Sequence, residues 1–119
     1  MLKKGHLYKV TFSEFIDGVT FERSDMIFSP RNDILYRDID MKFPIECECL
    51  FHINLGNMAW INGRIGMEGL TTIERPHTEK DFEDIEKAVK LCGLSYNKEQ
   101  NKIEGYDENY IYTKHCGRI

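Results

Sequence analysis

The chain has 119 residues, 41% of them hydrophobic and 30% charged, as expected for one globular domain spanning residues 1–119. Its 20 acidic and 16 basic side chains give a net charge of −4, which argues against nucleic-acid binding because such domains usually carry a basic excess. The start of the chain lacks the apolar core of a signal peptide, and no apolar run approaches the roughly 20 residues of a membrane span. We therefore expect no membrane association and an intracellular, cytoplasmic protein with reduced cysteines.

Short strands joined by tight turns are predicted over the first two thirds of the chain. The dipeptides Asp17-Gly18, Gly56-Asn57 and Asn62-Gly63 separate apolar stretches. Asp-Gly and Asn-Gly are strong hairpin signals, because a type I′ turn needs positive φ at both central residues. The predicted strands cover residues 6–13, 18–28, 39–55, 57–62, 64–67 and 70–75.

The longest predicted strand, residues 39–55, has an apolar residue at every odd position and mostly polar residues at even positions. A period of two is that of a strand with one buried face. Unbroken, the strand would extend about 50 Å at its usual rise. We therefore expect a bend at Pro44, which has no N–H to donate to a ladder.

Cys47 and Cys49 belong to this alternation and share its apolar face with Phe51 and Ile53. Free cysteine is among the most buried residue types and packs as a small hydrophobe. The spacing is neither the C-x₂₋₄-C of zinc sites nor the C-x-x-C of redox sites. We expect core thiols; a metal site completed by His115 and Cys116 is the alternative.

His52 falls on the even positions of the same strand, which places it on the opposite face beside Glu46 and Glu48. A neighbouring carboxylate can orient an imidazole and raise its pKa, so these side chains could serve in acid–base catalysis. A solvated sheet face has the same composition, and this is the plainer interpretation.

One helix is predicted over residues 79–92. Thr78 is a suitable N-cap with Asp81 at the capping-box position, and Gly93 suits the C-terminal cap. An apolar stripe runs along one face at Phe82, Ile85, Val89 and Cys92. Strands near 94–97, 101–105 and 109–114 follow. The chain is therefore predicted to be α+β and mainly antiparallel β, a meander or a small partly open barrel of about six to eight strands with the helix packed on it.

The segment RNDILYRDID, residues 31–40, joins two predicted strands and combines acidic side chains with tyrosine and arginine. Tyrosine and arginine are enriched among residues that dominate binding to partners. An ordinary charged connection is the alternative, and the acidic residues lack the regular spacing of a hard-cation site. The candidate partner-binding residues are Asp33, Tyr36, Arg37, Asp38 and Asp40.

These features favour a small interaction protein, of the regulator or inhibitor type, that binds a protein partner with a basic surface through an acidic, Tyr-bearing surface. Residues 14–48 hold nine acidic against four basic side chains, a local charge of −5, and no motif for catalysis, a metal or a cofactor is present. Two alternatives remain open. One is a small-ligand-binding protein or enzyme with a sheet pocket, and the other is a single-stranded nucleic-acid-binding module that stacks bases on Trp60, Tyr110 and Tyr112.

Overall fold

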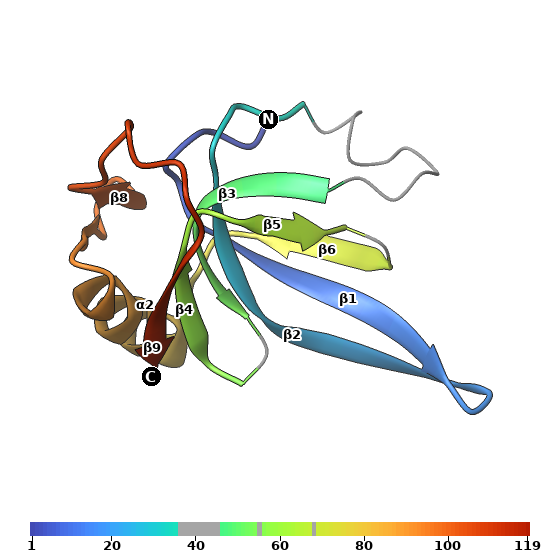
Figure 1. The fold of residues 1–119 in the computed structure, drawn as a ribbon. Helices are drawn as coiled ribbons and strands as arrows, with labels where there is room; N and C mark the ends of the chain where they lie inside the picture. Colours follow the sequence, from blue (N-terminus) through green and yellow to red (C-terminus); the bar gives the residue numbers. More distant parts are fainter. Residues whose placement is uncertain (36–45, 55, 68) are drawn as a thin grey trace.

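The computed structural model describes residues 1–35, 46–54, 56–67 and 69–119, which form an open antiparallel sheet with one helix beside it (Figure 1). Within these residues the sheet has seven strands in the order β6-β1-β2-β3-β4-β9, and β5 also pairs with β3. The α+β, mainly antiparallel architecture is confirmed, as an open sheet. The sheet strands are β1 (Tyr8–Ile16), β2 (Val19–Pro30), β3 (Glu46–Asn54), β4 (Met58–Ile61), β5 (Arg64–Gly66), β6 (Leu70–Glu74) and β9 (Lys114–Arg118).

The helix α2 (Glu79–Leu91) follows β6 and packs against β4 and β9. It is succeeded by a separate two-stranded sheet of β7 (Ser95–Asn97) and β8 (Lys102–Glu104). At the opposite end of the molecule the β1–β2 hairpin projects beyond the rest of the sheet (Figure 1). Its tip exposes about half of the surface of Ile16, Val19 and Phe21.

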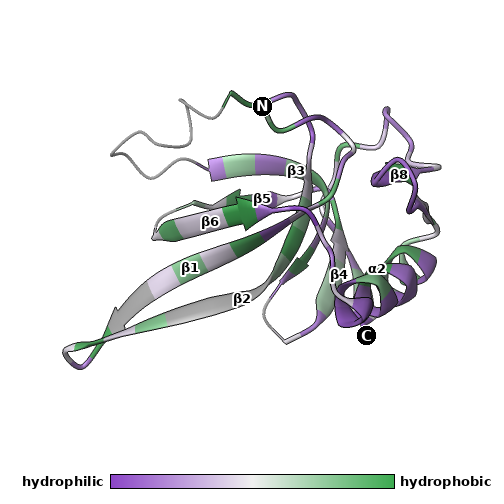
Figure 2. Ribbon diagram, turned by 180° about the vertical axis from the view of Figure 1, so that it is seen from behind, coloured by the Kyte–Doolittle hydropathy of each residue, from purple (hydrophilic) through white to green (hydrophobic). Residues whose placement is uncertain are grey.

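Two cores hold the fold together. In Figure 2 the ribbon of α2 carries both hydrophilic and hydrophobic residues, as expected for a helix that buries one face. We call the two cores the helix-side core and the second core. The helix-side core consists of Leu7, Ile27, Leu50, Phe51, Ile53, Ala59, Ile85, Ala88, Val89, Cys92 and Ile103. The second core consists of Leu2, Tyr8, Val10, Phe12, Phe28, Cys47, Cys49, Ile65 and Met67.

A β-bulge at Leu50 divides β3 between these two cores. Opposite β2, Ser29 pairs with Phe51 and Pro30 pairs with Cys49, so Leu50 is the extra residue. Leu50 and Phe51 both pack in the helix-side core, whereas Cys49 packs in the second core. The alternation of sides therefore shifts by one residue at the bulge. Cys49 is buried as predicted, but the prediction that it shares a face with Phe51 is wrong.

The dipeptide Asn62-Gly63 was predicted to close a hairpin, and this prediction is wrong. β4 and β5 lie one after the other along the same edge of β3, with Ile61 opposite Phe51 and Arg64 opposite Glu48. Both residues of the dipeptide have positive φ, 58° and 110°, and they make a kink within one long pairing. The kink places the Asn62 side chain toward the C-terminal part of the chain.

The last strand was predicted over residues 109–114 but forms later, at Lys114–Arg118, where it pairs with β4. Residues 110–112 do not join that ladder, and the carbonyl groups of Tyr110 and Tyr112 instead accept hydrogen bonds from the Asn62 side chain. The described part of the longest predicted strand begins at Glu46. The predicted bend at Pro44 and residues 39–45 of that strand lie outside the described residues.

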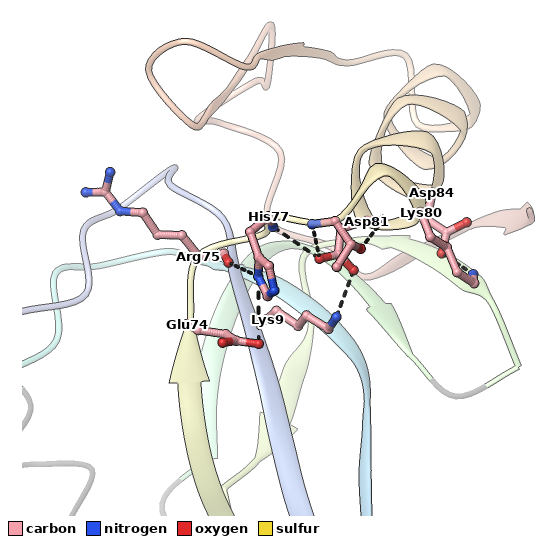
Figure 3. Close-up of polar contacts among 8 residues, drawn as sticks. Lys9, Glu74, Arg75, His77, Lys80, Asp81 and Asp84 are labelled. Carbon is pink, nitrogen blue, oxygen red and sulfur yellow. Dashed lines mark hydrogen bonds and ion pairs between the residues drawn. The ribbon is translucent and has the colours of Figure 1, made fainter.

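The N-terminal end of α2 is tied to the sheet, as Figure 3 shows. Thr78 and Asp81 form the predicted capping box, with the Thr78 hydroxyl accepting from the Asp81 N–H at 3.1 Å. The Asp81 carboxylate also accepts from the Thr78 and His77 N–H groups and pairs with Lys9 of β1 at 3.0 Å. Both side chains of that ion pair are mostly buried. The ion pair therefore joins the N-terminal end of α2 to β1.

Candidate functional site

An irregular segment between β8 and β9, residues 105–113, which we call the C-terminal loop, is held in place by one buried side chain. The Asn62 amide nitrogen donates hydrogen bonds to the carbonyl oxygens of Tyr110 at 2.8 Å and Tyr112 at 3.0 Å. Inside the loop, the Asp107 carboxylate accepts from the Asn109 N–H at 2.9 Å. The loop thus has a defined backbone path although it belongs to no helix or strand.

The loop presents apolar and aromatic side chains to solvent. Tyr110, Ile111 and Tyr112 are 37%, 67% and 71% exposed. The two tyrosine rings meet edge to face, with centroids 6.0 Å apart. Three consecutive exposed side chains of this kind, on a loop held by internal hydrogen bonds, make a preformed contact surface.

Lys4 connects the C-terminal loop to Asp33, near the start of residues 31–40, the segment predicted from the sequence to bind a partner. Its backbone N–H donates to the Asp33 carboxylate at 2.9 Å, and its ammonium group pairs with Glu108 at 2.8 Å. The hydrogen bond to Glu108 raises the pKa of Lys4, and the same contact lowers the pKa of Glu108. Asp33 and the C-terminal loop therefore belong to one continuous surface.

Two hollows flank the C-terminal loop. The first, of about 600 Å³, lies between β3, β5 and the loop, and the second, of about 320 Å³, lies between the loop and the end of α2. The first is lined by Arg31, Glu48, Asn62, Gly63, Arg64, Ile111 and Thr113. The second is lined by Leu50, Ile61, Asn62, Cys92, Gly93, Leu94, Gly105, Tyr106, Asp107, Tyr110 and Lys114.

Of the five partner-binding residues predicted from the sequence, the structure describes Asp33 alone. Its side chain is exposed and holds the Lys4 N–H. The other four, Tyr36, Arg37, Asp38 and Asp40, lie outside the described residues. The prediction for these positions stays a prediction.

His52 does not lie on a solvated face beside Glu46 and Glu48, and this prediction is wrong. The bulge at Leu50 moves it to the other side, and only 6% of its surface is exposed. Burial lowers the pKa of His52 to about 4, although the Asn62 backbone partly opposes this shift. Glu46 and Glu48 instead pair with Arg64, at 3.5 and 3.3 Å. The predicted imidazole–carboxylate group is not assembled.

The His52 ring is instead part of an aromatic stack across three strands. It stacks on Trp60 of β4 with centroids 6.0 Å apart and nearly parallel planes, and Trp60 lies 4.7 Å from the His115 ring of β9. Within the described residues the His52 Nδ1 atom has no hydrogen-bond partner. A buried imidazole that stays neutral at pH 7 is a packing element here.

The four cysteines form two separate groups. Cys47 and Cys49 are buried in the second core. Cys92 belongs to the helix-side core, and Cys116 packs against that core from β9. The predicted metal alternative required Cys47, Cys49, His115 and Cys116 to converge, and they do not. Among the described residues no group of three or more His, Cys, Asp or Glu side chains is arranged to hold a metal ion.

Sequence reasoning missed the role of Asn62, because the Asn-Gly dipeptide predicted a turn and nothing nearby pointed to residues 110–112. A sheet pocket is one of the alternatives that the sequence leaves open, but the positions of the two hollows were not predicted, since they depend on where the C-terminal loop returns to the sheet. Comparison of the chain with protein-family models, curated proteins and solved structures gives no match. In the described part of the chain, no helix is both long and apolar enough to cross a membrane.

Proposed function

We propose that this chain is a small interaction protein, of the regulator or inhibitor type, that binds another macromolecule through an acidic, Tyr-bearing surface. The surface combines the C-terminal loop with the turn that carries Asp33. The observation that carries the proposal is the exposed triplet Tyr110-Ile111-Tyr112, fixed in place by the buried Asn62 amide.

The exposed triplet has the properties of a binding hot spot. Tyrosine is enriched among residues that dominate interface energies, because it offers a large apolar ring with a polar tip and few rotatable bonds. Because Asn62 already holds the Tyr110 and Tyr112 backbone, less conformational entropy is lost when a partner binds. The hollows on both sides of the loop can receive protruding side chains from the partner.

The exposed carboxylates near the triplet favour a basic partner surface. Asp33, Asp107 and Glu108 are exposed, and Lys4 pairs with the last of these. Carboxylates at the rim of an interface steer a basic partner and suppress acidic ones. This agrees with the negative charge of the whole chain.

The test is affinity capture from lysate of the source cell with matched surface variants. Ile111→Ala and Tyr112→Ala remove exposed apolar side chains from the loop, and Phe21→Ala removes one from the distant hairpin tip. We expect one stoichiometric macromolecular partner that the wild type and Phe21→Ala capture and that both loop variants lose. Equal capture by all four proteins would exclude the loop as the binding surface.

The partner-binding residues predicted from the sequence in segment 31–40 need a separate variant. Changing Asp33, Asp38 and Asp40 together to Lys reverses the charge of that segment. We expect weaker capture and at most a small fall in melting temperature, since the exposed Asp33 carboxylate gives up its hydrogen bond to the Lys4 N–H. Unchanged capture would remove this segment from the site.

A small-ligand site is the second candidate, and the larger hollow supports it. Its volume of about 600 Å³ lies within the usual range of roughly 300–1,000 Å³ for ligand pockets. Arg31 and Arg64 line it together with Asn62 and Thr113. An empty eluate in the capture experiment, followed by a melting-temperature rise with an anionic small molecule that Arg64→Ala abolishes, would favour this candidate.

A further inference from the structure

We propose that Cys92 and Cys116 form a disulfide when the protein meets a small-molecule disulfide, and that this bond staples β9 to the end of α2. The inference does not depend on the proposed partner. It concerns two thiols that lie far apart in sequence and together in the fold.

The two residues meet where the last strand passes the helix. Cys92 is the C-cap residue of α2 and is 7% exposed. Cys116 lies in β9 and packs against the helix-side core that contains Cys92. The neighbouring residues Leu91 and Gly117 show that the two segments are adjacent, because a Cβ atom on Gly117 would lie 3.6 Å from the Leu91 side chain. Burial raises the pKa of Cys92, and so does the hydrogen bond between its thiol and the Cys116 sulfur, which stabilises the protonated form of Cys92.

Access distinguishes the two thiols and sets the order of the reaction. Cys116 is half-buried and accessible, whereas Cys92 is buried. The Cys116 thiolate attacks one sulfur of the small-molecule disulfide, forming a mixed disulfide and releasing one thiolate. The Cys92 thiolate then attacks the Cys116 sulfur and releases the second. The two protein thiols lose two protons and two electrons, and the small disulfide is reduced to two thiols.

The other pair of cysteines provides an internal control. Cys47 and Cys49 are also neighbours through a hydrogen bond, but they lie two residues apart in one strand and both are buried. Their Cα atoms are therefore about 6.6 Å apart, at the long limit of disulfide geometry. We expect this pair to stay reduced under conditions that oxidise Cys92 and Cys116.

The bond would close a ring that contains β7, β8 and the whole C-terminal loop. Closing such a ring lowers the conformational entropy of the unfolded chain. We therefore expect the oxidised protein to melt roughly 10 °C higher than the reduced protein. The ring also fixes the C-terminal base of the loop against the helix.

The experiment treats the reduced full chain with glutathione disulfide and maps the tryptic peptides without reduction. We expect peptides 91–98 and 115–118 to appear as one linked species, lighter by two hydrogen atoms than the sum of its parts. Peptide 43–64, which contains Cys47 and Cys49, should keep two free thiols. Cys116→Ser should lose both the linked species and the rise in melting temperature, while Cys47→Ala should keep both.

Two outcomes would overturn the proposal. One is that Cys92 and Cys116 remain free or carry separate glutathione adducts after long exposure. The other is that the linked species forms in the unfolded chain alone, which is detected by comparing oxidation with and without denaturant. Because the mapping uses the wild-type chain, its result stands even if a cysteine variant folds poorly.

Discussion

The side-chain amide of Asn62 donates a 3.0 Å hydrogen bond to the backbone carbonyl of Tyr112, a residue 50 positions later in the chain. The same nitrogen donates to the Tyr110 carbonyl. Asn62 is itself buried and adopts a positive φ of 58°. One side chain therefore couples the kink between β4 and β5 to the exposed loop.

Replacing Asn62 with Gly tests this coupling, because Gly keeps the positive φ and removes only the amide. The Tyr110 and Tyr112 carbonyl groups lose their donor, and at about 0.5–1.5 kcal/mol per hydrogen bond we expect the free energy of unfolding to fall by about 1–3 kcal/mol. Hydrogen exchange should accelerate at residues 110–113 more than at β1 or β2. Asn57→Gly, at an exposed turn with a similar φ, is the matched control and should leave exchange in the loop unchanged. Protection of the loop that survives in Asn62→Gly would contradict the assigned role.

The sequence predicted correctly those elements that depend on residues only a few positions apart. The helix and its capping box depend on Thr78 and Asp81, three positions apart, and both are confirmed. For Asn62-Gly63, the positive φ of both residues was predicted correctly, but the hairpin between β4 and β5 was not formed, because both strands pair with β3. Whether two residues of positive φ reverse a chain or kink it depends on the strand alongside, here β3.

The same limit explains the error at His52. Strict alternation assigns a face by counting residues, and one bulge residue, Leu50, changes every assignment beyond it. No residue in this stretch marks the bulge, since leucine fits either a regular or a bulged position. The C-terminal loop was missed for a related reason, because its partner Asn62 is distant in sequence.

The ion pair between Lys9 and Asp81 predicts a dependence of stability on acid pH. Burial alone would raise the pKa of Asp81, but hydrogen bonds from Lys9 and from the Thr78 and His77 N–H groups outweigh it and lower the pKa below its usual 3.8. Because the folded-state pKa is depressed, this stability is present above about pH 4 and is lost as pH falls through the folded pKa. Asp81→Asn should lower the free energy of unfolding at pH 7 by about 2–4 kcal/mol.

Chemical unfolding at pH 7, 4 and 3 measures this effect. The variant should lose less further stability between pH 4 and 3 than the wild type. Asp84→Asn serves as the control, because Asp84 pairs with Lys80 on the exposed side of α2 and such pairs contribute only about 0–1 kcal/mol. If Asp81→Asn and Asp84→Asn lower the free energy of unfolding equally at pH 7, the buried contact between Asp81 and Lys9 contributes no more stability than an exposed ion pair.

Because Cys49 is buried in the second core, we predict that a polar side chain at this position destabilises the fold. Cys49 has no exposed surface and packs among apolar side chains. Cys49→Ser should destabilise the fold by about 1–3 kcal/mol, because a hydroxyl group replaces an apolar thiol in the core. Thermal unfolding under reducing conditions measures the change. Cys116→Ser, at a half-buried position, should differ from wild type by about 0.5 kcal/mol or less, and a Cys49→Ser protein with the wild-type melting temperature would refute tight burial.

His52 predicts a second pH dependence in a separate window. Burial lowers the pKa of His52 from 6.5 to about 4, so between these values the unfolded chain binds a proton that the folded state excludes. Stability therefore falls as pH decreases from 6.5 to 4, by about 3 kcal/mol at most. His52→Phe keeps a ring against Trp60 and should flatten this slope. Some slope should remain, because burial also lowers the pKa of His6.

Urea unfolding at pH 7, 5.5 and 4.5 separates the His52 effect from that of Asp81, which begins below this range. His77→Gln is the control, since the side chain of His77 is 59% exposed and should leave the slope unchanged. If His52→Phe loses stability with falling pH as steeply as the wild type does, the imidazole is protonated in the folded state. That result would mean that His52 reaches solvent, and it would return the imidazole to the list of groups available for acid–base chemistry.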